Sequence, residues 1–350
     1  MYLSLILIGL ILVSFVEVRY NRDRGGFSFW FFIILFYLMS FLRWERGTDW
    51  LSYLSLYENP YFAGDGSYEY TFWGLNILFG SILKIDYTLF LLIEATILYS
   101  FIYHGIKSNC KYWVTALFCI YITLGNGGIF FVRQTIAMAI IFYSYKYVVD
   151  KNYKYFFLWI GFAACFHVAS IVALPVIFIY DLKINKTTVL VCLLSLLLLV
   201  VLYRYGFLTR FENKLVGYKE IGNSSSTSIQ FYYGIINKLV FLFVFFVFRG
   251  KSLEEKGLLK IFVYGLVLYV FFGSLNITLS RLANFVAMFQ VYQISRIVER
   301  NRMYRRPRYA FLIIVIVLMG LRSLFSVSPY KDLFVPYKSI FNKELKVEVY

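Results

Sequence analysis

Three ionisable side chains lie in or beside long apolar stretches of this sequence: Arg133, His167 and Arg281. An ionisable group in hydrocarbon costs about 2.5–3.5 kcal/mol on insertion scales, so it commonly has a function. Arg133 follows a glycine-rich segment, 125–128, near the start of a predicted helix. A guanidinium beside the N–H groups and positive dipole of a helix N-terminus suits an anion such as phosphate. The alternative is that Arg133 and Arg281 only extend their charge toward the membrane surface.

Three groups could accept a proton in a reaction: His167, Asp49 and Glu69. An imidazole titrates near neutral pH and can act as a base or bind a substrate. A hydrogen-bonded structural histidine is the simpler interpretation of His167. Asp49 and Glu69 lie in the polar segment 43–70 between apolar stretches. Nothing in the sequence ranks these three groups against one another as the base.

The segment RWERGTDWLSY, residues 43–53, directly follows an apolar stretch. In one interpretation it is a turn at the membrane surface, with Gly47 at the bend and Trp44 and Trp50 anchored at the interface. In the other, its charged residues, Arg43 among them, belong to a binding site.

Several common catalytic and binding signatures are absent from the sequence. There is no GxxxxGK[ST], GxGxxG, HExxH or GxSxG motif, so nucleotide hydrolysis, zinc hydrolysis and serine hydrolase chemistry are unsupported. The four cysteines show no CxxC or metal-ligand spacing and give no reason to expect disulfides. We therefore expect no metal and no cofactor.

The composition is that of a membrane protein. Of the 350 residues, 61% are hydrophobic and 15% are charged, whereas a soluble domain carries about 25% charged residues. The net charge of +16 comes from Lys and Arg that flank apolar runs. Such residues set membrane topology, so no nucleic-acid partner is expected. The predicted fold class is an all-α, polytopic integral membrane protein.

About ten apolar runs are long enough to be transmembrane helices, and two others are irregular. The irregular stretches are 71–84, which is short, and 155–180, which His167 and Pro175 interrupt. The predicted spans are 2–18, 27–42, 87–103, 112–125, 129–149, 187–203, 231–248, 258–273, 276–295 and 309–325.

The basic loops predict how these segments cross the membrane. All of them can be cytoplasmic at once only if 71–84 and 155–180 each enter and leave on one side. Both stretches are therefore predicted to be re-entrant or broken, and a cavity is expected beside His167, because irregular backbone at membrane depth must be buried or line a wet cavity. The chain is then one transmembrane domain, residues 1–350, with both termini outside. Its outer segments are the loops 43–70 and 204–230 and the tail 326–350.

The polar residues, taken in order, resemble the EpsG/Wzy-type family of bacterial polysaccharide polymerases. The resemblance extends over nearly the whole chain; each piece alone is short, and the ordered set is fairly specific. The matching pieces are Arg43-x3-Gly47-Thr48-Asp49-Trp50-x2-Tyr53, Glu69 ahead of an apolar stretch, Arg133-Gln134-x2-Ala137, Phe166-His167-x-Ala169-Ser170 and the tail around Tyr337.

Such a resemblance implies glycosyl transfer at the outer face of the bacterial cytoplasmic membrane. The substrates would be undecaprenyl-diphosphate-linked oligosaccharides, and the growing glycan would move from its lipid diphosphate onto a new repeat unit. The product would be an exopolysaccharide, capsule or O-antigen chain. The lipid bilayer, a chain-length regulator and a flippase are the implied partners.

Each candidate residue has an expected role in that reaction. Arginines are expected to do what a metal does in many soluble glycosyltransferases, because they can stabilise the charge of the leaving diphosphate. The candidates for the base are Asp49, Glu69 and His167. The expected ligands of the diphosphate or glycan are Arg43, Tyr53, Arg133, Gln134 and Arg281.

Two other kinds of function stay open. A flippase or transporter of a lipid-linked glycan also has broken helices and intramembrane charge, but it usually shows repeat symmetry, and this sequence has no internal repeat. An O-antigen ligase would need a second acceptor. A membrane acyltransferase usually offers a His–Asp or His–Glu motif, and His167 has no carboxylate close to it in sequence.

Overall fold

Every regular element that the structure describes is helical, as the sequence predicted. The computed structural model describes residues 2–20, 26–47, 49–62, 68–124, 127–130, 133–183, 225–248, 250–275, 277–300, 309–319, 334 and 336–342. Within these ranges no strand forms, and the one strand-like contact is an isolated antiparallel bridge between Arg43 and Ser339.

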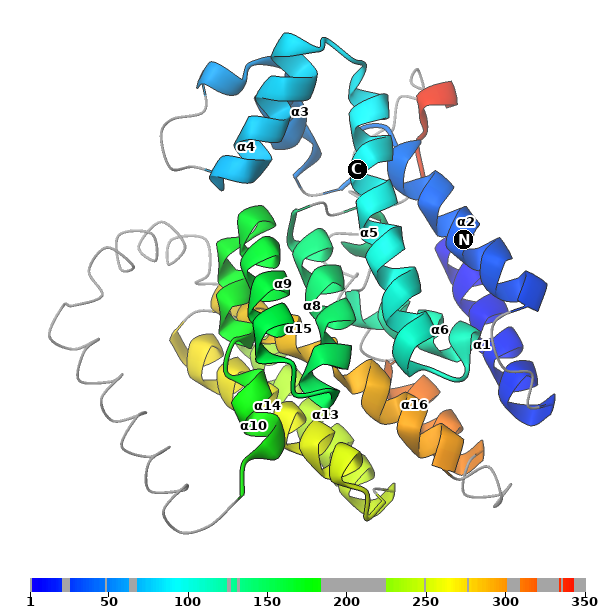
Figure 1. Ribbon diagram of the computed structural model, residues 1–350. Coiled ribbons are helices and arrows are strands. Elements are labelled where there is room, and N and C mark those ends of the chain that lie inside the picture. Colours follow the sequence, from blue (N-terminus) through cyan, green and yellow to red (C-terminus); the bar gives the residue numbers. More distant parts are fainter. Residues whose placement is uncertain are drawn as a thin grey trace, which may run out of the picture.

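The helices form a bundle with a small cap above one end (Figure 1). The bundle elements are α1 (Tyr2–Tyr20), α2 (Gly26–Phe41), α5 (Tyr87–Asn109), α6 (Trp113–Leu124), α7 (Gly127–Phe130), α8 (Arg133–Val149), α9 (Tyr153–Phe166), η3 (Val168–Ala173), α10 (Val176–Asp181), α13 (Ser225–Phe248), α14 (Leu253–Leu275), η4 (Ile277–Leu282), α15 (Ala283–Ala287), α16 (Gln290–Arg300) and the helix Tyr309–Met319. The cap elements are α3 (Trp50–Glu58), η1 (Pro60–Phe62), α4 (Tyr70–Asn76) and the π-helical η2 (Ile77–Ile82). A last short element is η7 (Ile340–Asn342).

Among the described helices, three are long and apolar enough to cross a membrane: Tyr87–Asn109, Gln230–Phe248 and Leu253–Ser274. Shorter apolar helices are Gly26–Phe41, Trp113–Leu124, Tyr153–Phe166, Val168–Asp181 and Tyr309–Met319. These helices bear out an all-α membrane protein, while the number of about ten spans stays a prediction. The predicted span 187–203 lies outside the described residues.

Two predicted boundaries differ from the structure. The span predicted over 276–295 is not one helix, because the described chain there is divided into η4, α15 and the start of α16. Ser280 Oγ donates to the Ile277 carbonyl at 2.6 Å, and such a local bond competes with the regular helix ladder. The loop predicted over 204–230 is helical from Ser225, because α13 begins ahead of its apolar part. The rest of that loop lies outside the described residues.

The stretch 155–180 is a broken helix. α9 ends at Phe166, His167 has an extended backbone with φ −154°, and the chain continues through η3 and α10. Lys151 Nζ and Asp181 Oδ2 are 2.9 Å apart, so the two ends of the stretch lie together at the lower end of the bundle in Figure 1. The chain therefore enters and leaves this stretch on one side, as the positions of the basic loops require.

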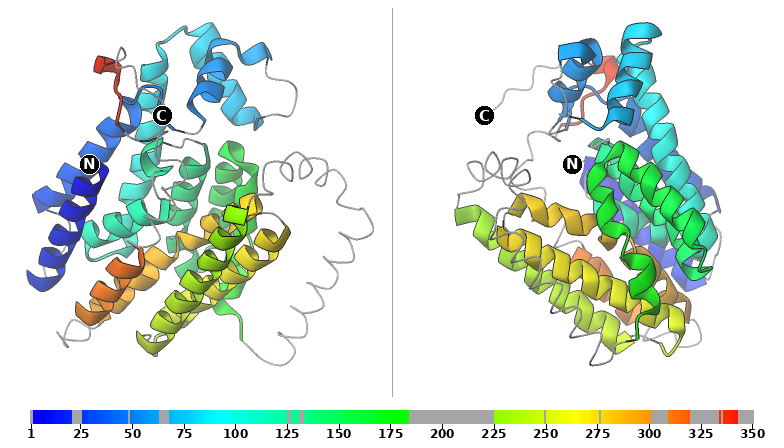
Figure 2. Two further views of the ribbon diagram at one scale, coloured as in Figure 1. Left: turned by 180° about the vertical axis from the view of Figure 1, so that it is seen from behind. Right: turned by 60° about the vertical axis from the view of Figure 1, so that its left-hand side comes forward.

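The other irregular stretch, 71–84, belongs to the cap. α4 continues directly into η2, and the Tyr57 hydroxyl donates to the Ile85 carbonyl at 2.8 Å, where the chain leaves the cap. π-Helical turns are rare and occur frequently at functional sites. α4 also packs against α9, so the cap rests on the upper end of the bundle (Figure 2).

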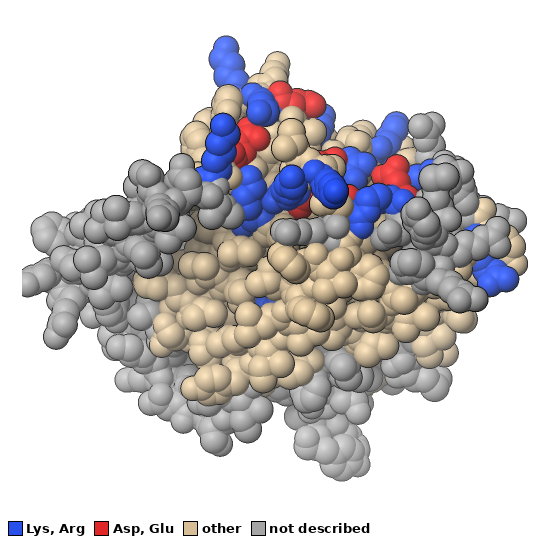
Figure 3. Space-filling view, turned by 90° about the horizontal axis from the view of Figure 1, so that it is seen from below, with Lys and Arg blue, Asp and Glu red and all other residues tan. Residues whose placement is uncertain are grey.

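The lower end of the bundle is basic. α5, α8 and α16 carry Lys107, Lys146 and Arg300, respectively, in their last turns. Seen from below, Lys and Arg side chains gather in a band across this face (Figure 3). The positive-inside rule predicts such a distribution for a cytoplasmic end, and the cap would then lie on the outer side.

α6 is the central helix of the bundle, since every residue from Trp113 to Thr123 is buried. The first N–H groups of a helix need acceptors outside it. Glu17 of α1 accepts from Val114 N at 2.9 Å, from Thr115 N at 2.8 Å and from Thr115 Oγ1 at 2.8 Å. A carboxylate from a different helix therefore caps α6 inside the protein.

Replacing Glu17 with Ala should destabilise the bundle, because the capped N–H groups of α6 would lose buried acceptors. We expect the free energy of unfolding to fall by about 2 kcal/mol, the upper end of the range for helix caps. Glu17→Gln keeps one acceptor oxygen and should lose less. Thermal unfolding in detergent measures both variants, and an unchanged Glu17→Ala protein would contradict this role.

Candidate active site

An ion pair joins the cap to the upper end of the bundle. Arg133, the first residue of α8, donates through Nη1 to Oε2 of Glu69, which immediately precedes α4. Only 17% of the Arg133 side chain and 15% of the Glu69 side chain are exposed. Opposite charges this far from water attract each other more strongly than they do at a surface. Two candidate residues that are distant in sequence therefore make a direct contact.

Aromatic rings of the cap surround the Arg133 guanidinium. Its Cζ lies 4.7 Å from the ring centroid of Tyr68, 5.3 Å from that of Phe72 and 5.5 Å from that of Tyr53. Arg133 Nε also donates to the Tyr53 hydroxyl at 3.2 Å. Burial raises the pKa of Tyr53 to about 12, so this hydroxyl keeps its proton at neutral pH. The guanidinium is thus fixed by cation–π contacts as well as by Glu69.

Glu69 also connects the cap to the break in the helix at His167. Its Oε1 accepts from Val168 N at 3.0 Å and lies 3.9 Å from His167 Nδ1. The extended backbone of His167 ends α9 and leaves the Val168 N–H pointing at the carboxylate. Ala169 N donates to His167 Nδ1 at 3.3 Å, so the ring proton of a neutral His167 lies on Nε2. One carboxylate therefore contacts both α8 and the α9–η3 break.

Arg43 lies beneath the cap and is only 2% exposed. Its Nη1 donates to the carbonyl of Phe130, and its Cζ lies 5.4 Å from the ring centroid of Trp50. The side chain of Glu94, on α5, interacts electrostatically with the guanidinium of Arg43. Phe130 ends α7 just ahead of Arg133, so Arg43 fixes the chain that leads into α8.

Gly47 allows the loop that carries Arg43 to approach Phe130 closely. Its φ of +112° is a conformation that residues with a Cβ rarely adopt. A Cβ at this position would lie 2.8 Å from the Phe130 carbonyl oxygen. Glycine is therefore required here by both backbone conformation and space.

The C-terminal segment 336–342 packs against the same loop. Trp44 N donates to the Lys338 carbonyl at 2.8 Å, and Ile340 N donates to the Leu42 carbonyl at 2.9 Å. Lys338 Nζ lies 2.5 Å from Glu45 Oε2. The tail thus packs directly on the loop, which places a segment from the end of the sequence beside one from its beginning.

A comparison with known protein families matches residues 26–339, most of the chain, to the EpsG family. The chain belongs to the EpsG family. The comparisons with curated proteins and with solved structures gave no match. EpsG membership bears out the resemblance on which the expectations rest, and together with the apolar helices it supports a membrane protein with a polysaccharide-polymerase type of function.

The remaining candidate residues of this EpsG-family chain lie around the Arg133–Glu69 pair or apart from it. Asp49 precedes α3 without a side-chain capping bond, four residues before Tyr53. Gln134 follows Arg133 in the first turn of α8 and is half-buried. Arg281 is exposed on η4, which packs against η3, and its side chain has no hydrogen-bond or ion-pair partner among the described residues.

Three residues of this site were not predicted from the sequence. Glu94 is a carboxylate within the predicted span 87–103, and it carried the same signal that singled out Arg133, a charge in an apolar stretch. Tyr68 and Phe72 gave no signal, because the chain has 32 Tyr and 38 Phe and aromatic residues are common throughout it. Their role depends on the folding of the cap over α8.

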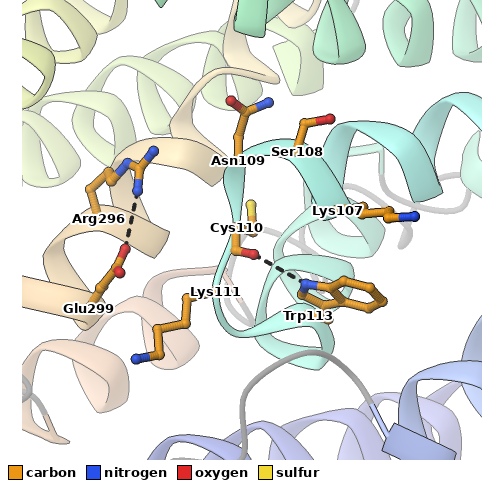
Figure 4. A pocket seen from close by; sticks show the side chains of 8 residues that line it. All are labelled: Lys107, Ser108, Asn109, Cys110, Lys111, Trp113, Arg296 and Glu299. Carbon is orange, nitrogen blue, oxygen red and sulfur yellow. Dashed lines mark hydrogen bonds and ion pairs between the residues drawn. The ribbon is translucent and has the colours of Figure 1, made fainter.

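A pocket is lined by residues other than the candidate residues (Figure 4). Its volume is about 320 Å³, and it lies between the α5–α6 turn and α16. Arg296 Nη1 in its wall is paired with Glu299 Oε2 at 3.1 Å. Its lining residues are Lys107, Ser108, Asn109, Cys110, Lys111, Trp113, Arg296 and Glu299.

Over the described parts of the chain, no group of three or more His, Cys, Asp or Glu residues is arranged to hold a metal ion.

Gly47→Ala should destabilise the protein by about 1–3 kcal/mol, because the new Cβ meets the Phe130 carbonyl and the backbone conformation is strained. Gly74→Ala is the matched control, since a Cβ at Gly74 in α4 meets nothing within 4 Å. That substitution should leave stability unchanged or raise it. Thermal unfolding of the two purified variants measures both changes in stability. Equal changes in Gly47→Ala and Gly74→Ala would contradict the close approach of Gly47 to the Phe130 carbonyl.

Proposed function

We propose that this protein is a membrane polysaccharide polymerase that joins undecaprenyl-diphosphate-linked oligosaccharides at the outer face of the bacterial cytoplasmic membrane. The observation that carries the proposal is the cluster in which Arg133, Glu69 and His167 meet between cap and bundle. Glu69 immediately precedes α4, which belongs to the cap at the upper end of the bundle in Figure 1, whereas the basic face is seen from below in Figure 3. Membership in the EpsG family supports the same reaction class.

The cluster offers the groups that such a transfer needs. A hydroxyl oxygen of the acceptor sugar attacks the anomeric carbon of the donor, and the bond from that carbon to the diphosphate oxygen breaks. The hydroxyl proton passes to a base, for which Glu69 and His167 are the nearest candidates to Arg133. The diphosphate leaves with the bonding electron pair, and a cation such as Arg133 stabilises its charge.

The other candidates take supporting roles in this proposal. Arg43 is buried and bound to Phe130, so its proposed role is to position α8 rather than to touch the diphosphate. Arg281 is exposed on an element next to η3 and is proposed as a second cation for the lipid diphosphate. Asp49 stays a candidate base for the acceptor, Gln134 stays a candidate ligand, and the Tyr53 hydroxyl is proposed to hold Arg133 and a sugar hydroxyl.

The proposed reaction also defines the partners. The donor and acceptor lipids reach the outer face only after transport across the membrane, so a flippase must act earlier. Control of product length requires a separate chain-length regulator or an intrinsic limit of the enzyme. The secreted product would be an exopolysaccharide, a capsule or an O-antigen chain.

Arg133→Ala should reduce polymerisation by about 100- to 1000-fold, the effect expected when a group that stabilises developing negative charge is removed. Glycan length in the native host would shift from long chains to single repeat units. Lys84→Gln is the control, because Lys84 is an exposed cation of the cap outside the cluster. Long chains of normal abundance in Arg133→Ala cells would contradict the proposal.

Transport of a lipid-linked glycan is the alternative, favoured by the broken helix at His167. Purified protein in detergent, supplied with lipid-linked repeat units, distinguishes the two functions because no membrane separates two compartments. We expect longer glycans and released lipid diphosphate from a polymerase. If thermal unfolding shows that the purified protein is folded and it still forms neither product, the result would favour the transporter.

A further inference from the structure

The charge of Arg133 is already satisfied inside the protein. Glu69 accepts from its Nη1 and Tyr53 from its Nε, and three aromatic rings surround its Cζ. An anion that forms an ion pair with this guanidinium must therefore compete with Glu69. The protein therefore neutralises this guanidinium with a carboxylate of its own.

Glu69 is held by more than Arg133. Its two oxygens have different partners, Oε2 on Arg133 and Oε1 on Val168 N, 3.0 Å away. Losing the first contact leaves the second in place. The carboxylate can thus give up the guanidinium without leaving the cluster.

We propose that Glu69 holds the Arg133 guanidinium before the donor binds, and that the donor diphosphate then takes its place on Arg133. This inference rests on the function proposed above and adds an order of events to it. A diphosphate carries more negative charge than one carboxylate, so it can replace Glu69 without leaving the buried guanidinium unpaired.

The exchange links donor binding to the proton transfer. Once Arg133 holds the diphosphate, the Glu69 oxygen that contacted Arg133 no longer has that partner, so it can accept a hydrogen bond from the acceptor hydroxyl. The acceptor hydroxyl can then give its proton to the Glu69 carboxylate while its oxygen bonds to the anomeric carbon and the diphosphate leaves with the electron pair. Before the donor arrives, Glu69 is engaged with Arg133 and the base is withheld.

The test compares binding with turnover in Glu69→Gln, which removes the negative charge and keeps the size of the side chain. Purified protein in detergent is titrated with inorganic pyrophosphate as the probe. Affinity should rise by about tenfold, within the usual range of coupling between two ligands. Turnover with lipid-linked units should fall by about 100-fold or more, since the base is lost. A purely structural role of Glu69 would weaken both.

Two variants control this experiment. Glu58→Gln removes an exposed carboxylate at the end of α3 and should change neither quantity. Arg133→Ala, combined with Glu69→Gln, should abolish the gain in pyrophosphate affinity, which places the probe on Arg133. Persistence of the gain in the double variant would overturn the proposal.

A measurement on the native protein covers the case in which Glu69→Gln does not fold. Carbodiimide and an amine label accessible carboxylates, and peptide mass spectrometry reads the extent at Glu69. Pyrophosphate should speed labelling of Glu69 if it displaces the carboxylate from Arg133, and slowed or unchanged labelling would contradict the exchange. Two outcomes separate this inference from the proposed function. If the native protein makes glycan but folded Glu69→Gln shows no gain in pyrophosphate affinity, this inference alone is overturned. If Glu69→Gln shows the gain but the native protein makes no glycan, the proposed function is overturned and the exchange stands.

Discussion

The ion pair between Arg133 and Glu69 lies largely out of water, and each charge depends on the other. Removing one partner of a buried pair is far more costly than replacing both, because the charge that stays behind is left without compensation. The pair also joins two parts of the fold, since Glu69 belongs to the cap and Arg133 begins α8. The same contact thus holds the cap on the bundle and sets the electrostatics of the candidate active site.

Contacts beneath the cap fix where that pair can form. Arg43 binds the Phe130 carbonyl just before α8, and Gly47 provides the space for this approach. The segment 336–342 forms backbone hydrogen bonds with the same loop. Three segments that are remote in the sequence therefore determine the position of the Arg133 guanidinium, and residues that never touch a substrate can still affect the site.

Charge in an apolar stretch is a strong physical signal, and it pointed to Arg133 and His167. Glu69, in the polar segment 43–70, was a candidate base for a different reason, and the structure brings the three residues together. The break at His167 also agrees with the topology inferred from the basic loops. The helical fold class followed directly from the length and composition of the apolar runs.

Other features depended on three-dimensional packing that no local pattern encodes. Hydropathy alone predicted one helix over 276–295, and it does not detect the local hydrogen bond of Ser280 that accompanies the 3-10 turn. Arg281 carried the same signal as Arg133 but has no ion-pair partner in the described structure. The rings of Tyr68 and Phe72 surround Arg133 only because the cap folds over α8.

The cap that Glu17 places on α6 has a consequence for how the chain is assembled in the membrane. α6 has 12 residues, about 18 Å at 1.5 Å per residue, well short of the roughly 30 Å of hydrocarbon in a bilayer. It is also buried among other helices, and its first N–H groups need an acceptor outside the helix. α1 precedes α6 in the chain and already carries the carboxylate that these N–H groups require. α1 is therefore made before α6, and a chain that lacked α1 would leave these buried N–H groups without their acceptor.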